Sequence, residues 1–77
     1  MPRITRLASV SIYIYADDHA PPHFHVRGPD IDIQVDIETL QVMRGDYKAS
    51  ALAEAITWAA GNQPVLRAKW SELNERD

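Results

Sequence analysis

The sequence has no cysteine, and this absence excludes several kinds of site. Without a thiol, the chain cannot form a disulfide, bind zinc through thiolates or use a cysteine nucleophile. It also lacks a run of 18 or more apolar residues, so no segment is suited to span a membrane as a helix. The first residues lack the long apolar stretch of a secretory signal. We therefore expect a cytoplasmic protein that has no membrane partner.

The chain is also short and has few positively charged residues. With 77 residues, the chain is too short for two domains or for a dinucleotide-binding enzyme, so residues 1–77 are expected to form a single small domain. A core of this size contributes only a few kcal/mol, which favours a small partner protein or self-association. The 8 Lys and Arg residues are outnumbered by 11 Asp and Glu residues, giving a net charge of −3. This balance argues against a general nucleic-acid binder, although it leaves RNA open as a ligand.

The spacing of the apolar residues predicts strands first and helices second. Apolar and polar residues alternate in the first part of the chain, as in Val10, Ile12 and Ile14, which indicates half-buried strands. Later the apolar residues recur with helical spacing. The predicted strands are residues 8–16, 23–27, 31–37 and 40–44, and the predicted helices are 47–60 and 63–75. This order predicts an α+β fold, a four-stranded antiparallel meander sheet followed by two helices packed on one face.

The same alternation assigns polar side chains to the open face of the predicted sheet. A turn at Gly28-Pro29 would place His25 directly opposite Asp32, so that the carboxylate orients the imidazole. If the first two strands pair with like faces together, Tyr13 falls near His25. The residues expected to face a partner or ligand, besides the histidines, are Tyr13, Tyr15, Arg27 and Asp36.

All three histidines lie within seven consecutive positions, in a segment from Asp18 to His25 that reads Asp-His-Ala-Pro-Pro-His-Phe-His. Because His23 and His25 are two apart on a predicted strand, both imidazoles project to one side. This spacing suits a divalent metal ion held by His23, His25 and the nearby His19. A neighbouring carboxylate would be a further ligand, from Asp18, Asp32 or Asp36.

Other interpretations fit the same histidines. In a proton-transfer site, His25 acts as a general base oriented by Asp32, and His23 acts as the acid. In a structural interpretation, the two prolines and His19 fix the turn between the first two strands. Exposed histidines balanced by nearby acids are also ordinary surface chemistry. The sequence does not choose between these interpretations.

The segment from Asp18 to Val26 resembles a family of short bacterial proteins, the domain-of-unknown-function family 4160. The resemblance extends through residues 36–42 and 58–62 to Trp70 and covers almost the whole chain. It implies no established activity. It does imply an association with a two-gene unit, because genes of this family often lie beside a gene for another small protein. Some members have been proposed to resemble toxin–antitoxin components.

Two functions are therefore expected. The first is a protein-interaction module, one component of a toxin–antitoxin-like two-gene unit, which binds a small partner protein through the His/Tyr/Asp face or through an edge of the sheet. The alternative is a small hydrolase or ribonuclease-like toxin, with or without a bound metal. Its catalytic residues would be His23, His25 and Asp32, with Arg27 stabilising the charge on a phosphate.

Overall fold

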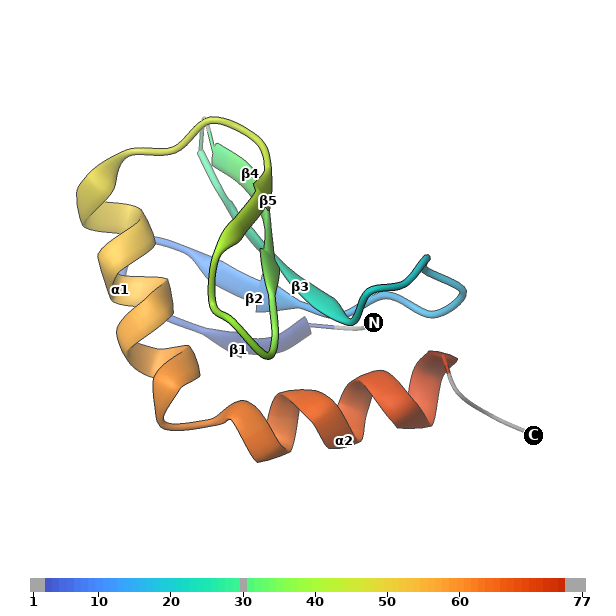
Figure 1. Cartoon of the computed structure of the whole chain (residues 1–77). Helices are drawn as coiled ribbons and strands as arrows, with labels where there is room; N and C mark the ends of the chain where they lie inside the picture. Colours follow the sequence, from blue (N-terminus) through green and yellow to red (C-terminus); the bar gives the residue numbers. More distant parts are fainter. Residues whose placement is uncertain (1–2, 30, 75–77) are drawn as a thin grey trace.

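The computed structural model describes residues 3–29 and 31–74, which form one antiparallel sheet and two helices (Figure 1). The elements are β1 (Arg3–Arg6), β2 (Ser11–Tyr13), β3 (His23–Gly28), β4 (Ile31–Asp36), β5 (Val42–Arg44), α1 (Ala49–Ala60) and α2 (Gln63–Asn74). The strands lie in the order β1-β2-β3-β4-β5, each antiparallel to the next. The α+β class and the meander are confirmed, but the sheet has five strands where the sequence predicted four.

Strand β1 is the element that sequence analysis missed. The predicted first strand, residues 8–16, is in fact a turn followed by the short strand β2, which spans Ser11–Tyr13. Arg3–Arg6 forms the edge of the sheet, and the N–H of Leu7 donates to the carbonyl of Val10 at 2.7 Å to close the turn. Within β1 only Ile4 is apolar, so no alternating pattern is long enough to reveal the strand.

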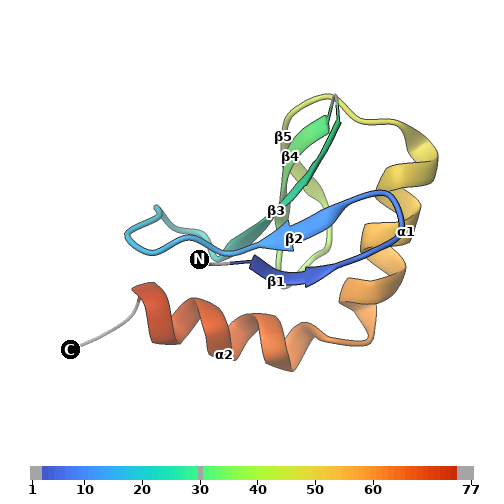
Figure 2. The same cartoon turned by 180° about the vertical axis from the view of Figure 1, so that it is seen from behind.

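The hydrophobic core lies between the sheet and the two helices. Phe24 and Ile33 are completely buried, and full burial of a side chain of this size contributes about 1.5–3 kcal/mol. The core also contains Val10, Ile12, Ile14, Val26, Val35, Ile37, Ala55, Ala59, Leu66 and Trp70. In both views α1 and α2 meet at an angle, and α2 passes the end of the sheet where β3 begins (Figures 1 and 2). Neither helix is long and apolar enough to cross a membrane, within the residues described.

The register between β3 and β4 differs from the predicted one. His25 faces Gln34, and Asp32 faces Arg27, so the predicted opposition of His25 and Asp32 is wrong. The sequence prediction placed Gly28 in the turn, but Gly28 is the last residue of β3 and the turn starts at Pro29. A Cβ on Gly28 would come within 2.9 Å of the carbonyl oxygen of Ser9. Glycine is therefore required at this position because two parts of the backbone approach closely, and the turn falls one residue later than predicted.

The two helices occur close to their predicted positions. Helix α1 begins at Ala49, two residues after the predicted start, and Lys48 occupies the N-cap without a side-chain capping hydrogen bond. It ends before Gly61, as the sequence predicts, and the Gly61 N–H donates to the carbonyl of Trp58. The predicted last residue of the second helix, residue 75, lies outside the described part of the chain.

Candidate metal centre

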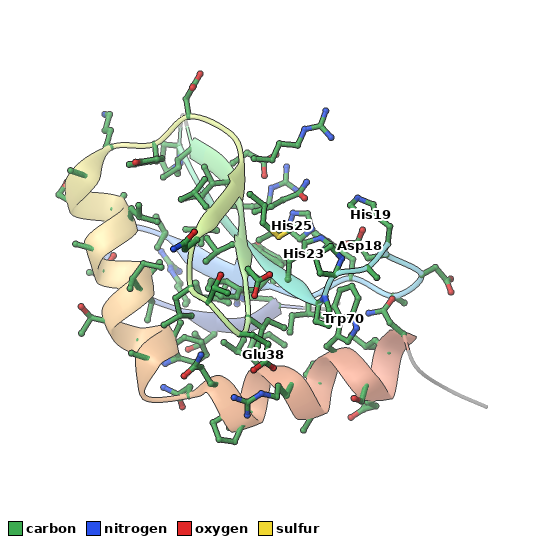
Figure 3. The ribbon with its side chains drawn as sticks, viewed as in Figure 1. Asp18, His19, His23, His25, Glu38 and Trp70 are labelled. Atoms are coloured by element: carbon green, nitrogen blue, oxygen red, sulfur yellow. The ribbon has the colours of Figure 1, made fainter. Side chains whose placement is uncertain are left out.

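Two histidines and one aspartate converge where the loop after β2 enters β3 (Figure 3). Strand geometry places His23 and His25 on the same side of β3, and the loop brings Asp18 back to them. Oδ2 of Asp18 lies 3.0 Å from Nε2 of His23 and 3.0 Å from Nε2 of His25. The three residues offer ligand atoms that all lie within 4.8 Å of one another.

The two ring nitrogens of His23 have different surroundings. Its Nδ1 lies 2.8 Å from the carbonyl oxygen of Pro21, and because a carbonyl only accepts, Nδ1 carries a proton. Its Nε2 is buried and makes no hydrogen bond within the described chain, although it is close to the carboxylate of Asp18. Without a proton, Nε2 would point a lone pair at a negatively charged oxygen 3.0 Å away. Two acceptors in this position are unfavourable unless a proton or a cation lies with them.

Helix α2 holds the loop that carries Asp18. The side-chain oxygen of Asn74 accepts from the backbone N–H of Asp18 at 2.7 Å, and its Nδ2 donates to the carbonyl of Tyr15 at 3.0 Å. Figures 1 and 2 both show this loop projecting beyond the sheet, next to the C-terminal end of α2. Asn74 therefore holds the segment from Tyr15 to Asp18 at both of its ends.

The charge state of Asp18 follows from opposing effects. Burial raises the pKa of Asp18, but the hydrogen bond from His25, the N–H of His19 and the positive charges of His23 and His25 together outweigh burial. The net result is a pKa below the usual value for this carboxyl. Asp18 is therefore ionised at neutral pH, which is the form that binds a cation.

Aromatic rings form two walls of the site. The indole of Trp70 packs on His23, with ring centroids 5.2 Å apart, and Tyr15 meets His25 edge-on at 4.6 Å. Guanidinium Nη1 of Arg27 donates to the hydroxyl of Tyr15 at 2.9 Å. His23 is fully buried, but 13% of the His25 side chain and 17% of the Asp18 side chain remain exposed. The site is thus shielded on the His23 side and open to solvent at His25 and Asp18.

The burial of His23 corrects one prediction. Sequence analysis placed His23 on the open face of the sheet, where an exposed side chain was expected. The parity of the strand is as predicted, since His23 and His25 lie on the same side. Because α2 passes the end of the sheet, however, Trp70 covers His23 and removes it from solvent.

The other predicted acids have different partners. Asp32 lies 3.8 Å from the guanidinium of Arg27. Asp36 faces His23 in the strand register, but its Oδ1 accepts from the N–H groups of Glu38 and Thr39. Sequence analysis considered three carboxylates as metal ligands. Of these three, only Asp18 belongs to the group of possible ligands that contains His23 and His25.

His19 lies beside the site but not in the group of three ligands. Its side chain is 67% exposed, and its ring centroid lies 5.2 Å from that of His23. Its Nδ1 faces the carbonyl oxygen of Ala20 at 3.4 Å. Rotation of this exposed side chain would be needed before it could join His23 and His25.

The predicted partner face is assembled in part. Tyr13 faces His25 in the sheet, as expected, and its ring stacks on Tyr15 with centroids 5.8 Å apart and planes 7° apart. Sequence analysis gave no role in the site to Trp70 or Asn74. Trp70 is one of the apolar residues that recur with helical spacing, which indicates packing alone, and no local pattern marks Asn74 as a residue that holds a loop.

The cluster contains the types of donor atom that metal sites use. Two imidazole nitrogens and one carboxylate are ligands of zinc and of divalent iron, cobalt, nickel and manganese in proteins. Three protein ligands leave positions for water or substrate. The hydrogen bond from Nδ1 of His23 to a backbone carbonyl is the outer contact that orients a ligating histidine.

A comparison with protein families matches residues 10–71 to the model of a domain of unknown function, DUF4160. The chain belongs to the DUF4160 family. The matched region of this DUF4160 protein contains Asp18, His23, His25 and Trp70, and it ends before Asn74. Comparisons with curated proteins and with solved structures gave no match.

Proposed function

We propose that this DUF4160 protein binds a divalent transition-metal ion through Asp18, His23 and His25 and uses it for hydrolysis. The observation that carries the proposal is the state of His23. Its Nδ1 proton is committed to the carbonyl of Pro21, while its buried Nε2 has no hydrogen-bond partner among the described residues and lies 3.0 Å from a carboxylate. A cation bound to Nε2 and Oδ2 would relieve this contact.

A metal ion accounts for the geometry better than proton transfer does. In a proton-transfer pair, the carboxylate binds one nitrogen of the base and leaves the other nitrogen free for the substrate. Here the Nε2 atoms of both histidines converge on one oxygen of Asp18. This arrangement places three donors around a common point, as a coordinated ion requires.

The open side of the cluster supports a catalytic role for the ion. Because His25 and Asp18 are partly exposed, the remaining coordination positions can take water. A divalent ion lowers the pKa of bound water towards neutrality and polarises an ester or phosphoryl oxygen. Ionised Asp18 would also help to neutralise the charge of the ion.

The test is a titration of the metal-free protein with Zn²⁺, Co²⁺, Ni²⁺ or Mn²⁺, followed through the histidine ring NMR signals. We expect saturation at one ion per chain, with shifts at His23 and His25. Because removal of buried His23 can unfold the chain, Asp18→Asn and His25→Ala are the variants to compare. Both should lose binding, and Asp32→Asn, at the acid that pairs with Arg27, should keep it.

Ring signals that stay unchanged at stoichiometric ion would overturn the proposed metal site, as would equal loss in Asp32→Asn. The catalytic part has its own readout, the hydrolysis of bis(p-nitrophenyl) phosphate by the metal-loaded protein. We expect turnover that depends on Asp18 and is retained in Asp32→Asn. A protein that binds the ion but gives no turnover would contradict the hydrolytic role alone.

A protein-interaction role is the second candidate, and the edge of the sheet at β5 favours it. Met43 lies in this edge strand and Tyr47 follows it, and their exposed fractions are 37% and 52%. An edge strand with exposed apolar side chains offers both backbone hydrogen-bonding groups and an apolar surface. A partner encoded beside this chain, as in a toxin–antitoxin-like unit, would bind there.

Co-expression with the product of the neighbouring gene tests this second role. Met43→Glu should abolish copurification, whereas Val65→Glu, at an equally apolar exposed position on α2, should not. Copurification that survives Met43→Glu, or a chain that stays monomeric beside its neighbour, would speak against it.

A further inference from the structure

A groove with a volume of about 830 Å³ lies where the ends of β1, β2 and β3 meet the start of α1. Its lining contains four basic side chains, Arg3, Arg6, Arg27 and Lys48. No acidic side chain belongs to this lining, as far as the chain is described. The acids in contact with lining residues are Glu54, which accepts from the N–H groups of Ala8 and Ser9, and Asp32 beside Arg27, so the basic side chains outnumber them.

A β-bulge places two of these arginines together. Arg3 and Arg6 are three residues apart, so in a regular strand their side chains would project from opposite faces. The register shifts between Arg3 and Thr5, so Arg3 faces Tyr13 while Arg6 faces Ser11. Tyr13 and Ser11 share one face of β2, and both arginines therefore lie on that face.

Three of the four cations have no anionic partner among the described residues. Arg3, Arg6 and Lys48 form no ion pair within residues 3–29 and 31–74, and Arg27 is 3.8 Å from Asp32. The two described cations of α2 differ in this respect, since Arg67 pairs with Glu38 and Lys69 pairs with Glu72. Like charges gathered without partners repel one another, so an anionic ligand would stabilise the groove.

The groove leads directly to the metal centre. Arg3 faces Tyr13 across the sheet, and Tyr13 faces His25. Side chains opposite each other on one face have Cβ atoms about 4.5–5.5 Å apart. Tyr13 also lines the groove and stacks on Tyr15, whose ring meets His25. A ligand in the groove would thus reach His25 within the width of two strands.

We propose that this groove binds single-stranded nucleic acid and presents a phosphodiester to Asp18, His23 and His25. Backbone phosphates would pair with Arg3, Arg6 and Lys48, and a base would stack against the tyrosine pair. The inference rests on the proposed hydrolytic function and names its substrate. In that reaction the oxygen of water bonds to phosphorus, the ester bond to the leaving sugar oxygen breaks, and a proton from the water passes to that oxygen.

Stacked aromatic rings favour nucleic acid over an acidic peptide as the occupant. Aromatic side chains on a sheet bind unstacked bases, and a positively charged groove follows the backbone. An acidic peptide would use the cations but would leave Tyr13 and Tyr15 without a matching partner. The acids on this face are also engaged, because Asp32 lies beside Arg27 and Asp36 accepts from the turn that follows β4.

The test is the fluorescence anisotropy of labelled 12-nucleotide RNA and DNA single strands, titrated with protein between 50 and 200 mM salt. The variant Arg3→Gln/Arg6→Gln should weaken binding by about tenfold or more and reduce the salt slope by about 1.4, since each phosphate contact contributes about 0.7 for single strands. The matched control, Arg67→Gln/Lys69→Gln, removes the same charge from α2 and should bind like the wild type. Comparing the affinities for RNA and for DNA shows which of the two nucleic acids the groove prefers.

Separate outcomes bear on the two proposals. Oligonucleotide binding that weakens equally in Arg67→Gln/Lys69→Gln would overturn the nucleic-acid inference and leave the metal site standing. The same conclusion would follow if a protein that takes up the metal bound neither oligonucleotide. Oligonucleotide binding by a protein that takes up no metal would overturn the proposed function, while the groove would still be a nucleic-acid site. Competition by poly-glutamate, with no affinity for either oligonucleotide, would assign the groove to an acidic peptide and overturn the inference.

Discussion

The imidazole of His23 packs against the indole of Trp70, with ring centroids 5.2 Å apart and both side chains buried. This contact joins the first residue of β3 to the last turns of α2. The candidate metal centre and the hydrophobic core therefore both contact Trp70, and we expect a change at this residue to affect both.

Replacing Trp70 with alanine should lower the free energy of unfolding by about 3 kcal/mol, because it leaves a cavity in the core. It should also weaken metal binding, since His23 loses the ring that fixes its plane. Urea unfolding and a zinc titration measure the two effects. The control is Val65→Ala on the same helix, where the exposed side chain should give a change within about 0.5 kcal/mol. Equal losses at both positions would contradict this account.

Asn74 tests whether the loop that carries Asp18 must be held in place. Asn74→Ala removes the acceptor for the Asp18 N–H and the donor to Tyr15. Residues that orient ligands in this way typically contribute 10- to 100-fold in metal affinity, and we expect a loss of about tenfold here. Isothermal titration with Zn²⁺ measures it, and Glu72→Ala on the same helix should bind normally. An affinity that stays at the wild-type value would show that the loop holds its position without Asn74.

The pH dependence of stability should include a contribution from Glu54. Hydrogen bonds from the hydroxyl and N–H of Ser9 and from the N–H of Ala8 lower the pKa of Glu54 below its usual value. A carboxyl with a lowered folded-state pKa stabilises the fold above its unfolded pKa, and this stabilisation is lost as pH falls through the folded pKa. Glu54→Gln should therefore lose stability at neutral pH and depend less on pH in the acidic range. Thermal melts across that range measure the difference, and parallel curves for variant and wild type would refute it.

Two glycines offer a matched pair of substitutions. Gly45 has a φ of +102°, and an added Cβ would lie 2.5 Å from the carbonyl oxygen of Asp32. Gly45→Ala should lower the free energy of unfolding by about 1–3 kcal/mol. Gly61 has a φ of −88° and its nearest contact would be 3.8 Å away, so Gly61→Ala should be neutral or slightly stabilising. A melt of each variant compares them, and a Gly45→Ala protein as stable as Gly61→Ala would disprove the clash.

Much of the fold could be predicted from the sequence because its apolar spacing is regular. The strand around Ile33 and the two helices follow from periods of two and of about 3.6 residues. Strand β1 could not be predicted, since a four-residue edge with one apolar side chain shows no period. The turn lies one residue later than predicted, and each β3 residue faces a partner two positions further along β4, because Gly28 is required by a neighbouring backbone and not by the turn.

The candidate site could be predicted only as far as local geometry extends. Strand alternation placed His23 and His25 together, but three carboxylates satisfied the same local argument. Asp18 reaches the pair because Asn74, 56 residues further along the chain, holds its loop. The burial of His23 likewise depends on Trp70, whose helical spacing shows an apolar face but not what that face covers. Long-range packing therefore decides which residues form the cluster.

The bulge in β1 compensates for the odd spacing of its two arginines. Side chains three residues apart on a regular strand project from opposite faces, so a β1 of the same length that paired regularly with β2 would turn one arginine away from the face that holds Tyr13. The composition and net charge would be unchanged, yet the groove would lose one of its cations. A relative without the bulge would need two arginines an even number of residues apart to keep the same charge on this face.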